Sequence, residues 1–319
     1  MTGIVLGIAD SARLFGTDMD TTDMDASDMS LVTIVDPQEH VVSPFDYAVT
    51  RGDGIFEATT VWHGKPVSLE AHLRRLAHSA SLMDLPRPNL TLFSQAVEEI
   101  IAQYDDPEPG PILRILVSRG LDADTGIGRT GSGLPHVWMF LDAHGALHQT
   151  RAISLASLTR GYSADITQRA PWLLLGAKTL SYAVNMAMHR ECDRRHVDDA
   201  VTVTEDGFVL ECPNSSIVAQ YGNHLVTPNP DIGILHGTSQ RELFSFMAQE
   251  GGSWEYRKLP LPQLQEADRL YMTHGGWVIP VSSLDDRRYQ VDESFVEQAN
   301  TAIHSGRTEK DALLVRPRD

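Results

Sequence analysis

Apolar residues in the first half of the chain recur with the two periods that mark helices and strands. Between residues 69 and 83 they are spaced so that Leu69, Leu73, Leu76 and Ala80 share one face of a predicted helix. The other elements expected in this half are a helix at 92–104, strands at 31–35, 55–62, 112–118 and 136–141, a turn at 63–66 and a glycine-rich loop at 120–133.

The second half is also patterned, but strands and helices do not alternate strictly, which argues against a doubly wound sheet. Two strands are expected to flank a hairpin turn at Glu205-Asp206-Gly207. Residues 227–237 read as a loop rich in proline and glycine, and the last residues as a polar, loosely held end. The expected elements are helices at 181–195 and 239–250 and strands at 152–158, 199–204, 208–211, 216–220, 268–273 and 277–281.

Two polar stretches divide the chain. We interpret residues 142–151 as a linker between a small α/β domain at 31–141 and a larger α/β domain at 152–319, which carries Lys178. Residues 1–30 hold an acidic Asp-Met repeat and are expected to form a flexible tail. A calcium loop is the alternative, because alternating aspartates can supply oxygen ligands, but the glycine and terminal glutamate of an EF-hand loop are missing.

The composition excludes several classes of function. The 319 residues are 42% hydrophobic, and the net charge of −17 argues against binding a nucleic acid backbone. We expect a cytoplasmic protein with no membrane partner, since no apolar run reaches the length of a membrane span and no secretory signal is visible. Cys192 and Cys212 fit neither a disulfide framework nor a metal-ligand spacing, so no metal site is expected.

A lone lysine follows the short apolar run Pro171-Trp172-Leu173-Leu174-Leu175. Desolvation near such a run disfavours the charged ammonium of Lys178, and a neutral amine can form a Schiff base with a carbonyl group. The alternative is a strand-end lysine whose ammonium extends to water. Lys178 is therefore a candidate catalytic residue. The choice between a Schiff-base lysine and a lysine that extends to water depends on the other segments of the chain.

Three segments are candidates for binding an anion. Arg75 lies on the predicted helix beside Arg74, and a guanidinium fork can bind phosphate. Thr238 and Ser239 follow Gly237 at the start of a predicted helix, where free N–H groups favour a phosphate. The Thr273-His274-Gly275 loop follows a strand and lets the backbone approach a ligand. The alternatives are a solvated arginine and an ordinary capped helix.

Glu211 ends the predicted strand at 208–211, one helix and one hairpin after Lys178. A buried carboxylate needs a partner, and the protonated nitrogen of a pyridine ring is a suitable one. Together, a Schiff-base lysine, this carboxylate, an arginine and a helix N-terminus describe a site for pyridoxal 5′-phosphate.

With these residues the chain resembles the class IV aminotransferases, the fold-type IV group of pyridoxal phosphate enzymes. The group holds branched-chain and D-amino-acid aminotransferases and 4-amino-4-deoxychorismate lyases. The resemblance runs from about residue 44 to residue 285. It rests on Arg51-Gly52-Asp53-Gly54-Ile55-Phe56-Glu57, His72-Leu73-Arg74-Arg75-Leu76, Ser118-Arg119-Gly120, Ala177-Lys178-Thr179-Leu180-Ser181-Tyr182, Glu211-Cys212-Pro213-Asn214-Ser215 and Leu235-His236-Gly237-Thr238.

The resemblance implies a two-lobed α/β fold of the D-amino-acid aminotransferase type, with the cofactor between the lobes, and a homodimer. It implies that Lys178 binds the cofactor covalently and moves protons, and that Glu211 pairs with the pyridine nitrogen. Arg75 would bind the phosphate, and Tyr182 would lie near the ring. Further cofactor contacts are expected from Gly237, Thr238, Ser239, Thr273, His274 and Gly275, and substrate contacts from Phe56, Arg114 and Arg119.

Three activities remain open for a small-molecule amino substrate. The segment from Ala177 to Ala187 is most similar to aminodeoxychorismate lyases, which eliminate pyruvate and leave 4-aminobenzoate. A transaminase of the branched-chain or D-amino-acid type would use the same lysine and carboxylate. A catalytically inactive binding protein is the third possibility. The chain departs from the family at His236, at Ser239-Gln240 and at His274-Gly275-Gly276, and these loops also shape the substrate side.

Overall fold

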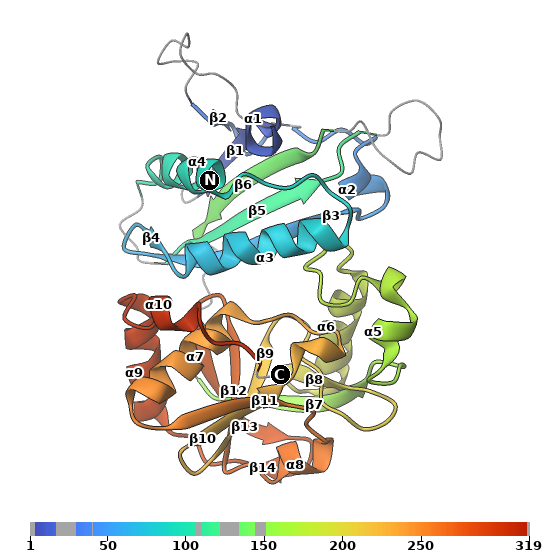
Figure 1. The fold of residues 1–319 in the computed structure, drawn as a ribbon, viewed down its shortest axis with the longest axis vertical. Coiled ribbons are helices and arrows are strands. Elements are labelled where there is room, and N and C mark those ends of the chain that lie inside the picture. Colours follow the sequence, from blue (N-terminus) through green and yellow to red (C-terminus); the bar gives the residue numbers. More distant parts are fainter. Residues whose placement is uncertain are drawn as a thin grey trace. The chain divides into compact units, whose positions relative to one another are not determined.

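The computed structural model describes residues 4–16, 30–39, 41–105, 110–121, 134–143 and 151–317. The chain forms two compact units, each built on its own sheet (Figure 1). The first comprises Met1–Leu147 and Ala177–Tyr182, and the second comprises His148–Gly176 and Ala183–Asp319. The division near residue 147 falls inside the expected linker. The Lys178 segment, however, belongs to the first unit and not to the C-terminal domain to which the sequence assigned it.

The first unit contains a six-stranded antiparallel sheet in the order β2-β1-β6-β5-β3-β4. Helices α3 and α4 pack against one face of it (Figure 1). The expected face of α3 is largely correct, because Leu73, Leu76 and Ala80 are buried. The elements are β1 (Ile4–Ala9), α1 (Ser11–Phe15), β2 (Val32–Val35), α2 (Tyr47–Thr50), β3 (Gly54–Trp62), β4 (Lys65–Pro66), α3 (Leu69–Leu82), α4 (Leu90–Ile101), β5 (Ile112–Ser118) and β6 (His136–Asp142).

The prediction of a flexible tail over residues 1–30 is wrong for its first part. Residues Ile4–Ala9 form β1, an interior strand that pairs with both β2 and β6. Periodicity alone does not separate a six-residue apolar run that forms a buried strand from one that forms a buried helix segment, and only its neighbours in the sheet satisfy its backbone groups. The Asp-Met repeat at 17–29, which carried the tail and calcium-loop interpretations, lies outside the described residues.

The second unit contains a sheet in the order β11-β10-β9-β12-β13-β7-β8, with β14 paired to β13. The β10–β11, β13–β7 and β7–β8 pairs are parallel and the others antiparallel. The strands are β7 (Ile153–Thr159), β8 (Asp199–Val203), β9 (Ser216–Tyr221), β10 (His224–Pro228), β11 (Ser253–Arg257), β12 (Arg269–His274), β13 (Trp277–Leu284) and β14 (Arg287–Arg288).

Helices cover this sheet. α6 packs on β7 and β8, whereas α7 packs on β12 and β13 and contacts α9 and α10 (Figure 1). The helices are α5 (Ile166–Arg169), α6 (Ala183–Arg195), α7 (Thr238–Gln249), α8 (Leu261–Gln265), α9 (Glu293–His304) and α10 (Glu309–Ala312), with 3₁₀ turns at Pro171–Leu173 and Pro230–Ile232. None of the helices in the described ranges combines the length and apolar character needed to cross a bilayer.

Three expectations about this unit need correction. The C-terminal end is not loosely held, because α9 buries Val296, Ala299 and Ile303 against the unit. Residues 224–228 and 253–257 are strands where none was expected. Residues 208–211 pair with β8 through an isolated bridge between Val203 and Val209 and do not form a continuous strand.

Candidate active site

The Lys178 segment lies between the end of α3 and the start of β3. The backbone N–H of Lys178 donates to Ser79 Oγ on α3 at 3.0 Å, and the Lys178 carbonyl accepts from Phe56 N at 3.0 Å. Two residues later, Leu180 N donates to Gly54 O at 2.8 Å. A Cβ at Gly54 would lie 2.3 Å from Val117 O and 2.7 Å from Leu180 Cδ1, so only glycine permits this packing.

The ring of Phe56 lies beside the lysine amine within the first unit. Lys178 Nζ lies 4.3 Å from the centroid of the Phe56 ring. The Tyr182 ring meets the same Phe56 ring edge to face at 5.4 Å. The structure thus brings together three residues that the sequence proposed, Lys178, Phe56 and Tyr182, and it seats the amine on an apolar surface.

A charged cluster lies beside them. Glu57 Oε1 accepts from Arg75 Nε at 2.7 Å, and Glu57 Oε2 accepts from Arg75 Nη2 at 2.8 Å. His72 Nδ1 contacts Glu57 Oε2 at 2.7 Å, and it must donate the proton because an ionised carboxylate only accepts. This cluster fixes the plane of the Arg75 guanidinium, whereas the neighbouring Arg74 is exposed and pairs with Glu70.

The cluster sets the protonation of its members. Burial raises the pKa of Glu57, but Arg75 and His72 outweigh it and hold the pKa well below its usual range. Burial lowers the pKa of His72, the Glu57 carboxylate raises it, and the charges of Arg75 and Lys178 lower it again, with a net lowering. Glu57 is therefore ionised and His72 neutral near pH 7. Both residues lie within the motifs that carry the family resemblance, but the sequence alone indicated no role for either of them.

The two arginines expected to contact substrate have different surroundings. Arg114 Nη1 pairs with Asp142 at 3.2 Å, and its guanidinium lies 5.5 Å from the Phe140 ring centroid. Its side chain remains 31% exposed. Arg119 instead forms hydrogen bonds to Asp53 and to the carbonyl oxygens of Met83 and Asp84. Arg114 keeps surface on which a substrate carboxylate can bind, and Arg119 is engaged in holding its own unit together.

Glu211 lies in the second unit, and two sets of contacts fix it. Its carbonyl accepts from the backbone N and the hydroxyl of Thr202 on β8, at 2.9 and 2.6 Å. Its Oε2 accepts from Leu235 N at 3.1 Å. The flanking residues Leu210 and Ile234 belong to one buried apolar cluster, which holds the two segments together. The contacts with Thr202 and Leu235 therefore fix the position of Glu211, and the residue is half-buried.

The start of α7 forms a cradle of donors in the same unit. Gly237 is the N-cap, and a glycine has no side-chain oxygen with which to cap the helix. A Cβ at Gly237 would lie 2.3 Å from Ser216 Oγ. Thr238 and Ser239 are buried, and Ser239 Oγ accepts from Gly276 N at 2.8 Å, which ties α7 to the loop after β12.

That loop contributes further groups. The hydroxyl of Thr273 is buried with no hydrogen-bond partner among the described residues. His274 and Gly275 are half-buried, and a Cβ at Gly275 would meet nothing within 4 Å. The bond from Gly276 N to Ser239 Oγ joins this loop to the start of α7, and the anion site predicted for Gly237, Thr238, Ser239, Thr273, His274 and Gly275 stays a prediction.

A hydrogen-bonded chain behind this cradle was not expected from the sequence. Tyr256 OH donates to Gln240 Oε1 at 2.8 Å and therefore accepts from His236 Nε2 at 2.9 Å. Burial raises the pKa of Tyr256, which keeps this hydroxyl protonated. The chain joins His236, one of the departures from the family pattern, to β11, a strand that the sequence did not indicate.

These donor sets fit pyridoxal phosphate by their chemistry. A phosphate dianion matches the N-terminus of α7, where the N-cap is a glycine, and the Thr273 hydroxyl, which has no hydrogen-bond partner in the described part of the chain. A pyridine nitrogen matches a fixed carboxylate at Glu211, and an aldehyde matches the amine of Lys178. Lys178 and Arg75 lie in the first unit, and Glu211 and the start of α7 lie in the second.

Comparisons with known proteins point to one family. The family model for amino-transferase class IV matches residues 54–284. The bifunctional aminodeoxychorismate lyase / D-amino acid transaminase of Mycobacterium tuberculosis is 35% identical over 290 residues, covering 86% of this chain and 97% of that protein.

Solved structures agree. A fold IV-transaminase from Curtobacterium pusillum matches with a TM-score of 0.86 and 34% identity, covering 97% of this chain and 99% of that one. A hypothetical aminotransferase from Mycobacterium tuberculosis in its PLP-bound form matches with a TM-score of 0.78 and 33% identity, covering 86% and 96%. The architecture is that of the fold-type IV transaminases, and class IV aminotransferases use pyridoxal phosphate. This chain therefore belongs to the class IV aminotransferase family and is a pyridoxal phosphate-dependent enzyme.

Proposed function

We propose that this enzyme eliminates pyruvate from 4-amino-4-deoxychorismate and leaves 4-aminobenzoate. The observation that carries the proposal is the similarity to the bifunctional lyase and transaminase over 86% of this chain and 97% of that protein. The reaction is balanced without a co-substrate, because the atoms of the substrate divide between the two products. Formation of the aromatic ring supplies much of the driving force.

Lys178 is the residue that we assign to the chemical step. Pyridoxal phosphate, when bound, supplies a ring that accepts the electrons of the broken C–H bond. Lys178 binds the aldehyde carbon of the cofactor and, during turnover, removes the proton from the amine-bearing carbon of the substrate. The Phe56 ring 4.3 Å from Nζ supports this role, because it keeps the amine beside an apolar surface instead of bulk water.

The remaining assignments follow from charge and placement. Glu211 holds a proton on the pyridine nitrogen, and its bond from Leu235 N keeps the carboxylate in place. Arg75, oriented by Glu57, binds the phosphate, and so do the groups around the N-terminus of α7. Tyr182 would lie near the ring of the bound cofactor, and Arg114 would bind a substrate carboxylate in exchange for part of its contact with Asp142.

A transaminase of the D-amino-acid type is the second candidate. It is favoured by the same relative, whose name includes both activities, and by the similarity to a fold IV-transaminase. The two candidates share proton removal by Lys178 and proton retention by Glu211, so these residues cannot separate them. They differ in whether a keto acid is needed.

Two incubations of the purified holoenzyme test the proposal. With 4-amino-4-deoxychorismate alone, the lyase yields 4-aminobenzoate and pyruvate. With D- or L-amino acids and 2-oxoglutarate, a transaminase yields glutamate and a keto acid. Amino-group transfer without any lyase product favours the second candidate, and neither product in either incubation contradicts both. Lys178→Ala should abolish activity and the absorbance of the bound cofactor, whereas Lys65→Ala, at an exposed lysine, should leave both unchanged.

We also propose that the enzyme works as a homodimer, as the resemblance to the family implies. Light scattering on the eluting holoenzyme should give twice the chain mass of 35.2 kDa. A single-chain mass at assay concentration would contradict this.

A further inference from the structure

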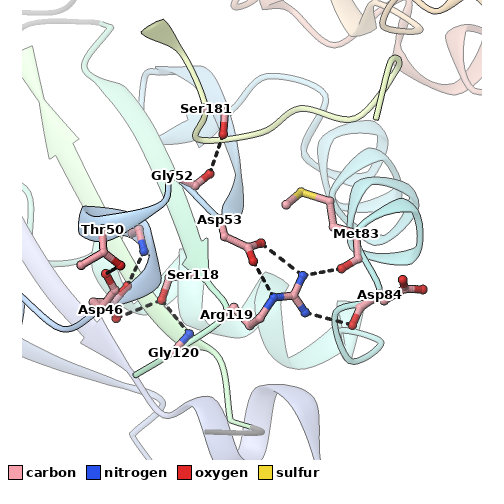
Figure 2. Close-up of polar contacts among 11 residues, drawn as sticks. Asp46, Thr50, Gly52, Asp53, Met83, Asp84, Ser118, Arg119, Gly120 and Ser181 are labelled. Atoms are coloured by element: carbon pink, nitrogen blue, oxygen red, sulfur yellow. Dashed lines mark hydrogen bonds and ion pairs between the residues drawn. The ribbon is translucent and has the colours of Figure 1, made fainter. Parts of the chain in front are cut away.

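The Arg119 side chain is the centre of a polar network in the first unit (Figure 2). Its Nε and Nη2 donate to the two carboxylate oxygens of Asp53 at 2.8 and 3.1 Å. Nη2 also donates to Met83 O at 2.6 Å, and Nη1 donates to Asp84 O at 3.3 Å. One guanidinium thus joins the residue before β3 to the residues that end α3.

The Lys178 segment rests on these same two elements. On the α3 side, Lys178 N donates to Ser79 Oγ at 3.0 Å. On the β3 side, the segment bonds to Gly52, Gly54 and Phe56, where Ser181 Oγ donates to Gly52 O at 2.9 Å (Figure 2). Any change in the separation of α3 and the start of β3 therefore moves the backbone that carries Lys178.

Arginine has the chemistry that this link requires. The last carbonyl groups of a helix have no partner within the helix and favour a cation. A planar guanidinium can donate to a carboxylate and to two carbonyls at once, which an ammonium cannot do in a fixed geometry. The side chain of Arg119 is only 15% exposed, so water competes little for these bonds.

The backbone around Arg119 is itself held in place. The neighbouring Ser118 hydroxyl donates to Asp46 Oδ2 at 3.1 Å and accepts from Gly120 N at 3.0 Å (Figure 2). Asp46 is fully buried and caps α2 through Ala48 N at 2.7 Å. The base of the Arg119 side chain is therefore fixed, so that its far end transmits a defined position to Asp53 and α3.

We propose that Arg119, through its pair with Asp53, is a positioning residue for Lys178 and not a substrate contact. It sets the spacing between α3 and β3 and so keeps Nζ over the Phe56 ring. The proposal rests on the proposed role of Lys178 as the residue that binds the cofactor and moves the proton.

Hydrogen exchange of the cofactor-free protein provides the first test. Arg119→Met should speed exchange of the Lys178 and Leu180 amides by about tenfold, while the Leu73 and Leu76 amides within α3 stay protected. Arg119→Lys should give a smaller acceleration, because it keeps the charge but loses the fork. Arg74→Met, at an exposed arginine of α3, is the matched control and should change nothing.

Steady-state kinetics of the holoenzyme provide the second test. Arg119→Met should lower kcat about tenfold with KM nearly unchanged, and Asp53→Asn should reproduce the effect without adding to it in the double variant. A raised KM with unchanged kcat would restore the substrate-contact interpretation and overturn the proposal.

The outcomes separate this inference from the proposed function. If Arg119→Met does not fold, the same hydrogen-exchange measurement on Arg119→Lys tests the proposal. Faster exchange that is confined to the Lys178 and Leu180 amides supports the proposal. An equal acceleration of exchange across the first unit overturns it. If Lys178→Ala abolishes cofactor absorbance but the Arg119 variants exchange like wild type, the positioning role fails and the proposed function stands. If Lys178→Ala keeps that absorbance, the proposed function fails and takes this inference with it.

Discussion

The carboxylate of Glu57 binds the guanidinium of Arg75 through both of its oxygen atoms, at 2.7 and 2.8 Å. Arg74, one position earlier on the same helix, pairs with Glu70 in solvent. Two adjacent arginines of one sequence motif therefore have opposite surroundings. The buried pair fixes the plane of the Arg75 guanidinium, whereas the exposed pair contributes little to stability because water screens it.

This contrast gives a direct test of phosphate binding. Arg75→Lys keeps the charge but loses the planar fork, so we expect affinity for pyridoxal phosphate to fall about tenfold or more. Affinity for pyridoxal, which lacks the phosphate, should not change. Equilibrium dialysis with both compounds measures this. Arg74→Lys is the control, and an equal loss of affinity for both compounds would exclude the phosphate as the group that Arg75 binds.

The neutral His72 makes stability depend on pH. In the unfolded chain this histidine takes up a proton near its ordinary pKa of 6.5, whereas in the folded protein its pKa is lowered. The unfolded state then binds more protons at low pH. The contribution of His72 to the free energy of unfolding is therefore fully present above about pH 6.5 and decreases as the pH falls, by up to about 1.4 kcal/mol per pH unit. The lowered pKa of Glu57 acts in the same direction below its ordinary value of 4.5.

Urea unfolding between pH 8 and pH 5 measures this dependence. His72→Gln should show a smaller loss of stability over that range than the wild type. His78→Gln, at an exposed histidine of the same helix, should behave like the wild type. Equal slopes in all three proteins would mean that His72 takes up its proton while folded.

At the start of α7, the residues around Gly237 leave no room for a larger side chain. Gly237→Ala would place a Cβ 2.3 Å from Ser216 Oγ, and moving the helix start should weaken affinity for pyridoxal phosphate about tenfold. We expect stability to fall by about 1–3 kcal/mol from overpacking. Adding Ser216→Gly removes the clashing hydroxyl and should restore most of both losses. If the double variant is no better than Gly237→Ala, the clash is not the cause.

The C-terminal helix α9 is part of the core of the second unit. Ile303 is 2% exposed, and Ile303→Ala should destabilise the protein by about 2–5 kcal/mol. Leu314, which is 78% exposed, provides the matched control, and Leu314→Ala should change stability by less than about 0.5 kcal/mol. Thermal unfolding of both variants checks this, and equal midpoints would show that α9 adds little to the core.

The sequence by itself determined the elements whose pattern is local. The spacing of Leu73, Leu76 and Ala80 predicted α3, and the apolar run at 112–118 predicted β5, because both patterns are formed by residues close together in the sequence. The motifs also identified the family, since residue types at Lys178 and Glu211 carry chemistry that does not depend on knowing their neighbours.

Only the tertiary structure decided which partner each residue has. β1 is interior because β2 and β6 supply its hydrogen bonds, and no local pattern contains them. The sequence predicted a substrate contact for Arg119, and only the structure showed that its guanidinium binds Asp53 and the end of α3. The role of Glu57 likewise depends on its contact with Arg75, 18 positions away. The connections between helices and strands decide which distant segments lie side by side, and therefore which residues can form hydrogen bonds and ion pairs. A pattern along the sequence does not contain this information.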